Sequence, residues 1–176
     1  MTATLDRLRT QAPPRPAEID PITVEVIRRR LVSIADEVDV NITRTAFSPY
    51  IYEYKDYAVG IVDHRGDLIC QCTAGMPVFV ADVMRAAVLD GLALYGADEL
   101  HPGDCVITND PWLATGHLPD FTFVSPIFHQ GRLVGFAGSI AHSPDVGGAL
   151  WSADCRELFE EGIRIPPVRY LREGKR

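Results

Sequence analysis

Two β-rich runs that meet at a short turn constrain this chain more than any other feature of its sequence. Residues 121–128 (FTFVSPIF) and 132–142 (RLVGFAGSIAH) flank the tripeptide HQG. Apolar and β-branched runs joined at a glycine-containing turn are typical of a β-hairpin. The start of the first strand in a hairpin lies beside the end of the second, so Phe121 and Ala141 should be close in space.

Each of these two strand ends carries a histidine and an aspartate three residues apart. The segment TGHLPD contains His117 and Asp120, and the segment AHSPDVGG contains His142 and Asp145. The first pair lies in a loop of about ten residues, longer than most connections, and such polar loops are often functional. Two imidazoles with one or two carboxylates are a typical ligand set for Zn, Mn or Fe(II). The sequence therefore predicts a metal site at this end of the sheet.

The residues alone leave other interpretations open. The pattern H-x-x-D is common, and a single histidine is more often a surface or hydrogen-bonded core residue than a ligand. Ser143 adjoins His142, but no G-x-S-x-G segment supports a nucleophilic serine. No glycine-rich loop with a lysine is present to hold phosphates, so any ATP is expected to be bound by another chain.

The remaining pattern predicts an α+β fold with a mixed sheet and two long amphipathic helices. The first helix is expected at 21–46, with Asp20 as N-cap, and the second at 78–96, ended by Gly96. The segments YAVGIVD and LICQC are expected to form a further hairpin around HRG. Residues 1–19 lack periodicity and are expected to form a mobile arm, with 20–176 as one folded unit.

Charge and cysteine usage narrow the class of protein. Seventeen basic and 24 acidic side chains give a net charge of −7, which argues against nucleic-acid binding. The sequence has no long apolar run or secretory h-region, so no membrane association and a cytoplasmic location are expected. Cys70 and Cys72 could form half of a metal site, but two small apolar residues on a buried strand face is the simpler interpretation.

Seven segments in the same order resemble the N-terminal part of the hydantoinase B/oxoprolinase family. They are DPITVEVIRRRLVSIADEV, RTAFSP, GDLICQ, PGDCVITNDP, GHLPD, GRLVGFAGSIAHSPDVGG and LFEEGIRIPPV. The family includes B-type subunits of ATP-dependent hydantoinases, the corresponding half of 5-oxoprolinase, and related subunits of acetone and acetophenone carboxylases. Because so many matches occur in order, the resemblance is specific.

This resemblance implies a site and a division of labour. The implied metal ligands are His117, Asp120 and His142, holding Zn or Mn, with Asp145 as a catalytic residue that orients a ligand or a bound water. An A-type partner with an ATPase-like fold would bind ATP and phosphorylate the oxygen of a lactam or ketone enol. The B-type subunit would then act on the activated intermediate, in which the oxygen has become part of a good leaving group.

The chain also departs from the family pattern. Tyr52 and Tyr54 stand where many relatives carry charged residues, which leaves the substrate open. Family B subunits are several hundred residues long, so a second polypeptide is expected to supply the missing C-terminal part, unless the chain is a truncated product. The apolar segment GIRIPPVRYL and the off-stripe residues Val24, Val32 and Val40 are expected to be uncovered.

Three functions follow from these observations. The first is a subunit that hydrolyses a cyclic amide such as 5-oxoproline or a hydantoin with ATP. The second is a subunit of an acetone- or acetophenone-type carboxylase, which would share the metal. The third is a non-catalytic remnant that completes a neighbouring subunit.

Overall fold

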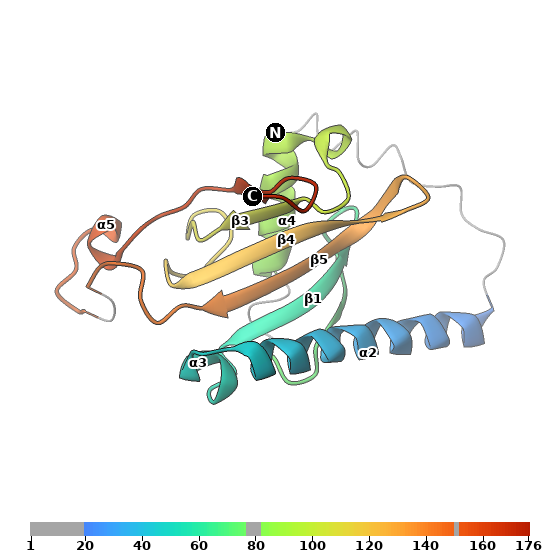
Figure 1. The fold of residues 1–176 in the computed structure, drawn as a ribbon, viewed down its shortest axis with the longest axis horizontal. Helices are drawn as coiled ribbons and strands as arrows, with labels where there is room; N and C mark the ends of the chain where they lie inside the picture. Colours follow the sequence, from blue (N-terminus) through green and yellow to red (C-terminus); the bar gives the residue numbers. More distant parts are fainter. Residues whose placement is uncertain (1–19, 77–81, 150–151) are drawn as a thin grey trace.

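The computed structural model describes residues 20–76, 82–149 and 152–176, which form one six-stranded sheet with helices (Figure 1). The strand order is β2-β1-β5-β4-β3-β6. The expected arm at 1–19 and the first residues of the second expected helix lie outside the described ranges. The elements are α2 (Pro21–Thr45), α3 (Pro49–Tyr52), β1 (Tyr57–Asp63), β2 (Leu68–Gln71), α4 (Asp82–Tyr95), the 3-10 helix η2 (Ala97–Glu99), β3 (Cys105–Thr108), β4 (Asp120–His129), β5 (Arg132–His142), α5 (Leu158–Glu161) and β6 (Val168–Leu171).

Helix α2 begins and ends where its sequence signals predict. The side chain of Asp20 accepts a hydrogen bond from the backbone N–H of Thr23 at 3.1 Å, and Pro21 occupies the first turn. Ala46 leaves the helix in an extended conformation, three residues before Pro49. The expectation of a long helix that stops before this proline is confirmed.

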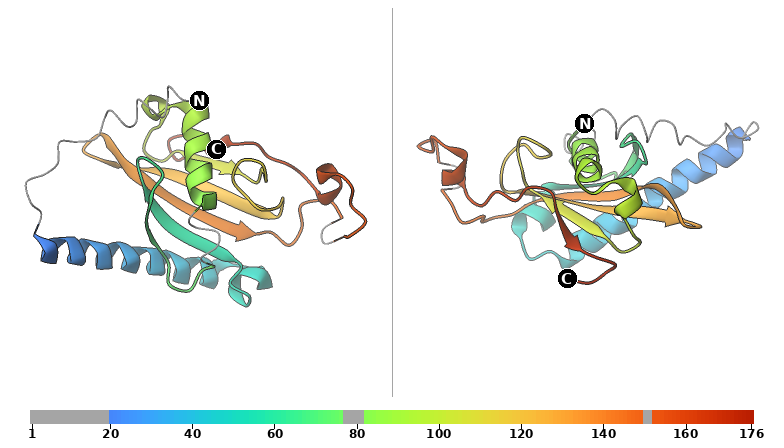
Figure 2. Two further views of the ribbon diagram at one scale, coloured as in Figure 1. Left: turned by 180° about the vertical axis from the view of Figure 1, so that it is seen from behind. Right: turned by 90° about the horizontal axis from the view of Figure 1, so that it is seen from above.

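The sheet carries a hydrophobic cluster on each face because alternate residues of β1 point in opposite directions. Tyr57 and Val59 pack with Ala35 of α2, in a cluster that also contains Cys70 and Cys72. Both cysteines are buried, as the apolar interpretation of this pair expects. The other cluster packs α4 against the sheet, as the view from above in Figure 2 shows, and contains Ala58, Val62, Met84, Ala87, Val88, Leu92, Val124, Phe136 and Ile140.

The hairpin of β4 and β5 forms as the sequence predicts. Gln130 and Gly131 make its turn with φ values of 49° and 76°, the left-handed conformation that two-residue hairpin turns favour. Phe121 pairs with Ala141, which confirms the expected proximity. The same register places Asp120 opposite His142 at the end of the sheet.

The α+β class is confirmed, but the sheet differs from the mixed sheet that the pattern predicts. Every pairing between the six strands is antiparallel, because β1 joins β5 and β3 joins β4 in the same sense as the two hairpins. The backbone of the C-terminal segment pairs with the sheet edge, because β6 joins β3. Its apolar side chains Ile163, Val168 and Tyr170 are exposed, as the sequence predicts. None of the described helices has the length and apolar character needed to cross a membrane.

Helix α2 is covered along only part of its length. Its buried residues are Ala35 and Asp39, in the half that packs on β1 and β2. The N-terminal end of α2 extends beyond the sheet, as Figure 1 shows. Exposed apolar side chains on α2 are Ile22, Val24, Val26, Ile27, Ile34, Val38 and Val40.

Candidate metal centre

Strand register brings Asp120 and His142 together. Asp120 is the first residue of β4 and His142 the last of β5, and the two form a cross-strand pair. Side chains in such a pair share a face of the sheet and start about 4.5–5.5 Å apart at Cβ. Both residues are almost fully buried, and Nδ1 of His142 lies 3.1 Å from Oδ1 of Asp120.

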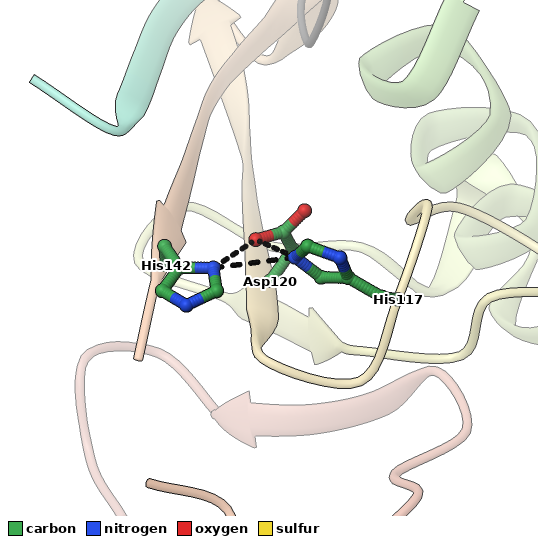
Figure 3. A group of neighbouring side chains, drawn as sticks. All are labelled: His117, Asp120 and His142. Atoms are coloured by element: carbon green, nitrogen blue, oxygen red, sulfur yellow. Dashed lines mark hydrogen bonds and ion pairs between the residues drawn. The ribbon is translucent and has the colours of Figure 1, made fainter. Parts of the chain in front are cut away.

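His117 reaches the same point from the loop between β3 and β4. The N–H of Asp120 donates to the carbonyl oxygen of His117 at 3.3 Å, so the loop turns back just before the strand begins. Nε2 of His117 then lies 3.0 Å from Oδ1 of Asp120 and 3.2 Å from Nδ1 of His142. Figure 3 shows the three side chains converging from the loop and the two strands.

The triangle of donor atoms has the size that a single metal ion requires. Its edges are 3.0, 3.1 and 3.2 Å. Donors about 2.0–2.2 Å from a Zn or Mn ion lie roughly 3.0–3.4 Å from each other in tetrahedral or octahedral geometry. Among the described residues, one group of histidine and aspartate side chains has ligand atoms close enough together to hold a metal ion. It consists of His117, Asp120 and His142. The residues present therefore fit the group that the sequence predicts.

The three side chains differ in their exposure to solvent. The side chain of His117 is 40% exposed, against 2% for Asp120 and 1% for His142. A site with three protein ligands and one solvent-facing side keeps open positions for water or substrate. The hydrogen bond to Asp120 raises the pKa of His117, while partial burial opposes this shift.

Asp56 is a further carboxylate at this site, and no motif in the sequence predicts it. Its backbone oxygen accepts from the N–H of His142 at 3.0 Å, and its Oδ2 lies 3.8 Å from Nδ1 of His142. Burial raises the pKa of Asp56, and the nearby Asp120 adds to the shift while His142 opposes it. Asp56 precedes Tyr57, which pairs with Ala141. Asp56 therefore reaches the site through the pairing of β1 with β5. No local sequence motif predicts this pairing.

Aromatic rings lie beside the buried histidine. The ring of Tyr50 is 5.0 Å from that of His142, and the ring of Tyr54 is 6.0 Å from that of Tyr50. The segment in which Tyr52 and Tyr54 depart from the family pattern therefore lies near the candidate centre. Tyr54 is 69% exposed, so it faces solvent beside the site.

Asp145 occupies the turn that follows β5. Its Oδ1 accepts from the N–H of Gly147 at 2.7 Å, and its side chain is exposed. This hydrogen bond is typical of an aspartate that stabilises a turn. The orienting role that the resemblance implies for Asp145 stays a prediction. Asp145→Asn keeps the oxygen that accepts from Gly147 but removes the charge. We expect lower activity in this variant if Asp145 orients a metal ligand or water, and unchanged activity if it only stabilises the turn.

Comparison with known proteins identifies related sequences. The sequence model of the family described as hydantoinase B/oxoprolinase matches residues 20–176. The 5-oxoprolinase PfmaA of Pestalotiopsis fici is 32% identical over 90% of this chain and 12% of its own length. Caprolactamase subunit beta of Pseudomonas jessenii is 30% identical over 90% of this chain and 27% of its own length. The chain therefore spans about a quarter or less of these two relatives.

Solved structures share the fold. The ATP-dependent caprolactamase from Pseudomonas jessenii matches with a TM-score of 0.75 and 26% identity, over 91% of this chain and 28% of that chain. Acetone carboxylase without nucleotide matches with a TM-score of 0.79 and 21% identity, over 89% of this chain and 21% of that chain. Both matches show that this α+β arrangement occurs as part of much longer chains.

Proposed function

The chain belongs to the hydantoinase B/oxoprolinase family, and from this membership we propose that it is the metal-binding part of a B-type subunit in an ATP-dependent cyclic-amide hydrolase. One observation carries the proposal: a loop histidine and a cross-strand aspartate–histidine pair bring three donor atoms within 3.2 Å of one another. Two relatives, a 5-oxoprolinase and a caprolactamase subunit, bear the names of enzymes that act on cyclic amides.

In this proposal His117, Asp120 and His142 hold a divalent ion such as Zn or Mn. A bound divalent ion supplies Lewis acidity toward an oxygen of the substrate or of water. The hairpin holds Asp120 and His142 in place, and His117 closes the triangle from the solvent side. Asp56 supports His142 through its backbone carbonyl and places a second negative charge beside the site.

We place ATP on a partner subunit. An A-type subunit would transfer the terminal phosphoryl group of ATP to the lactam oxygen and release ADP. Water then adds at the activated carbon, and the C–N bond breaks as the ring opens, which leaves an acyl phosphate. A second water releases the phosphate, so the reaction consumes two waters and one ATP. The names "subunit beta" and "ATP-dependent caprolactamase" of the relatives support a multi-subunit, ATP-using assembly. The rest of a B-type subunit, in the same polypeptide or in another, would complete this assembly, since the chain spans 27% of caprolactamase subunit beta.

Metal binding by histidine variants tests the proposal. We expect His117→Ala and His142→Ala each to abolish stoichiometric binding of Zn or Mn, measured by equilibrium dialysis and metal analysis. His64→Ala and His129→Ala are matched controls, because these two histidines lie at the turns of the two hairpins. Equal metal content in wild type and in the His117/His142 double variant would defeat the proposal.

The carboxylase is the second candidate, because acetone carboxylase shares the fold. A coupled ATPase assay with the assembled subunits separates the two reactions. ATP hydrolysis that depends on a lactam alone supports the hydrolase, whereas dependence on bicarbonate plus a ketone supports the carboxylase. A chain that binds metal but supports neither reaction in the full assembly would match the non-catalytic remnant.

A further inference from the structure

Asn109 lies directly after β3, and its buried side-chain amide is fully engaged. Nδ2 donates to the carbonyl oxygen of Leu118 and to that of Ile163, each at 2.8 Å. Oδ1 accepts from the backbone N–H of Ile165 at 2.6 Å. Asn109 has no solvent-exposed surface. One side chain therefore joins two segments that are more than 40 residues apart in the sequence.

The first of these segments is 163–165. Asn109 forms hydrogen bonds with its backbone, as the backbone of a neighbouring β-strand would. The amide pairs with the carbonyl of Ile163 and the N–H of Ile165, while the backbone N–H of Asn109 donates to the carbonyl of Ile165 at 3.1 Å. Thr108 adds a hydrogen bond from Oγ1 to the same carbonyl at 3.0 Å. An amide side chain carries both donors and an acceptor, so it can imitate a peptide group in this way.

The second segment is the loop that carries His117. Leu118, which accepts from Asn109, is fully buried and follows His117 directly. On the other side, Oγ1 of Thr115 lies 3.1 Å from the carbonyl oxygens of both Asn109 and His117 and can donate to either. The Asn109 side chain thus holds the residue after His117, and Thr115, two residues before His117, lies within hydrogen-bonding distance of the Asn109 carbonyl.

A second contact joins the same two segments. Nε and Nη2 of Arg164 donate to Oδ2 of Asp110 at 2.8 and 2.6 Å. The side chain of Asp110 is 0% exposed, and its Oδ1 accepts from the N–H of Trp112 at 3.1 Å. Residues 163–165 and the loop after β3 therefore bind each other through an ion pair as well as through the Asn109 amide.

We propose that Asn109 is a positioning residue that couples metal binding at His117 to docking of residues 163–165. Docking of residues 163–165 fixes the Asn109 side chain, which in turn holds the carbonyl of Leu118. The backbone next to Leu118 sets the direction of the His117 side chain toward Asp120 and His142. Coupling between two sites is reciprocal, so an ion that stabilises the loop also stabilises the docked segment. This inference rests on the proposed metal function, and it adds a distant segment on which that function depends.

Wild-type protein gives the first test. Hydrogen exchange at the N–H of Ile165, which donates to Oδ1 of Asn109, is measured with and without saturating Mn. We expect Mn to slow this exchange. Exchange at the N–H of Gly66, in the turn between β1 and β2, is the internal control and should not change. Exchange at Ile165 that is the same with and without bound Mn overturns the proposal.

The variant Asn109→Asp gives the second test. It keeps the shape of the side chain but removes two N–H donors and places a carboxylate against the carbonyl oxygens of Leu118 and Ile163. We expect roughly a tenfold or greater loss of Mn affinity, as for other groups that orient ligands, and loss of the Mn effect at Ile165. Asn41→Asp, on the exposed side of α2, is the matched control and should bind as wild type does.

The outcomes separate this inference from the proposed function. Folded Asn109→Asp that binds Mn within twofold of wild type overturns the coupling and leaves the metal site intact. Wild type that binds no divalent ion overturns both. If Asn109→Asp does not fold, as judged by circular dichroism, the exchange of wild-type Ile165 with and without Mn decides the matter.

Discussion

Asp120 and His142 are placed by strand register, whereas Asp56 is placed by the pairing of a third strand beside them. This difference gives Asp56 a distinct role. Its backbone carbonyl accepts from His142, an interaction that survives any change of side chain, while its carboxylate contributes charge 3.8 Å from Nδ1 of His142. The electrostatic part of its contribution can therefore be removed alone.

We expect Asp56→Asn to lower the affinity for Zn or Mn by roughly tenfold without unfolding the protein, because supporting groups around metal ligands have effects of this size. The measurement is competitive titration against a chelator, with thermal unfolding followed in parallel. Asp154→Asn, at an exposed loop position, is the control. Unchanged affinity in Asp56→Asn would show that its charge plays no part in the site.

At the scale of elements, a buried polar contact joins α2 to β1. The Tyr57 hydroxyl donates to the Asp39 carboxylate, and Oγ1 of Thr43 lies 2.8 Å from the same hydroxyl. Lys55 in turn donates to Thr43 at 2.8 Å. Burial and the neighbouring Asp39 raise the pKa of Tyr57 to about 12. The phenol is thus held in its neutral form by the folded protein.

The raised pKa predicts a loss of stability at high pH. Between the ordinary value of 10.0 and about 12, the unfolded chain releases the Tyr57 proton while the folded chain keeps it. The folded state then binds more protons, so the free energy of unfolding falls as pH rises through this window. We expect Tyr57→Phe to reduce the fall of the unfolding free energy with pH. At pH 7 the same variant should lower the unfolding free energy by about 1–3 kcal/mol, because Asp39 loses its hydrogen-bond donor.

Urea unfolding at pH 9, 10 and 11 measures this effect. Tyr52→Phe is the control, because Tyr52 is 41% exposed. The quantity compared is the slope of the unfolding free energy against pH in each variant. A Tyr57→Phe protein with the same pH slope as wild type would contradict the assignment.

At the scale of the whole molecule, two observations indicate that α2 takes part in an interface. One is the exposed apolar surface of α2, and the other is the greater length of the relatives. Val24 and Ile27 on this helix are 50% and 52% exposed. Apolar surface of this kind on one element generally marks an interface. The chain also spans only 27% of caprolactamase subunit beta. Our proposal is that further polypeptide covers α2 in the working assembly.

We therefore expect the purified 176-residue chain to self-associate and to lack lactam-dependent ATPase activity. Activity should appear when an A-type partner and the rest of the B-type subunit are added, and the same assembly with the His117/His142 double alanine variant should remain inactive. Sedimentation velocity and a coupled ATPase assay are the measurements. A monodisperse monomer that turns over ATP and lactam unaided would rule this out.

Local signals in the sequence are enough to predict the β4–β5 hairpin and α2, because turn residues and caps act over a few positions. The hairpin alone then predicts that Asp120 and His142 share a strand end, and the loop motif supplies His117. The resemblance to the family rests on seven segments spread over residues 20–168. The residues alone thus bring together two histidines with Asp120 and Asp145, and the resemblance singles out His117, Asp120 and His142 as the candidate ligands.

The tertiary structure alone decided where Asp56 and Asn109 act. Asp56 reaches the site because β1 pairs with β5, and Asn109 matters because residues 163–165 dock beside β3. The pairing of β6 with β3 at the sheet edge is likewise a contact between distant parts of the chain. Each of these contacts joins residues far apart in the sequence, and its free energy comes from burial and hydrogen bonds that exist only once the sheet has assembled. No local pattern records such contacts, because they depend on which faces the whole chain brings together.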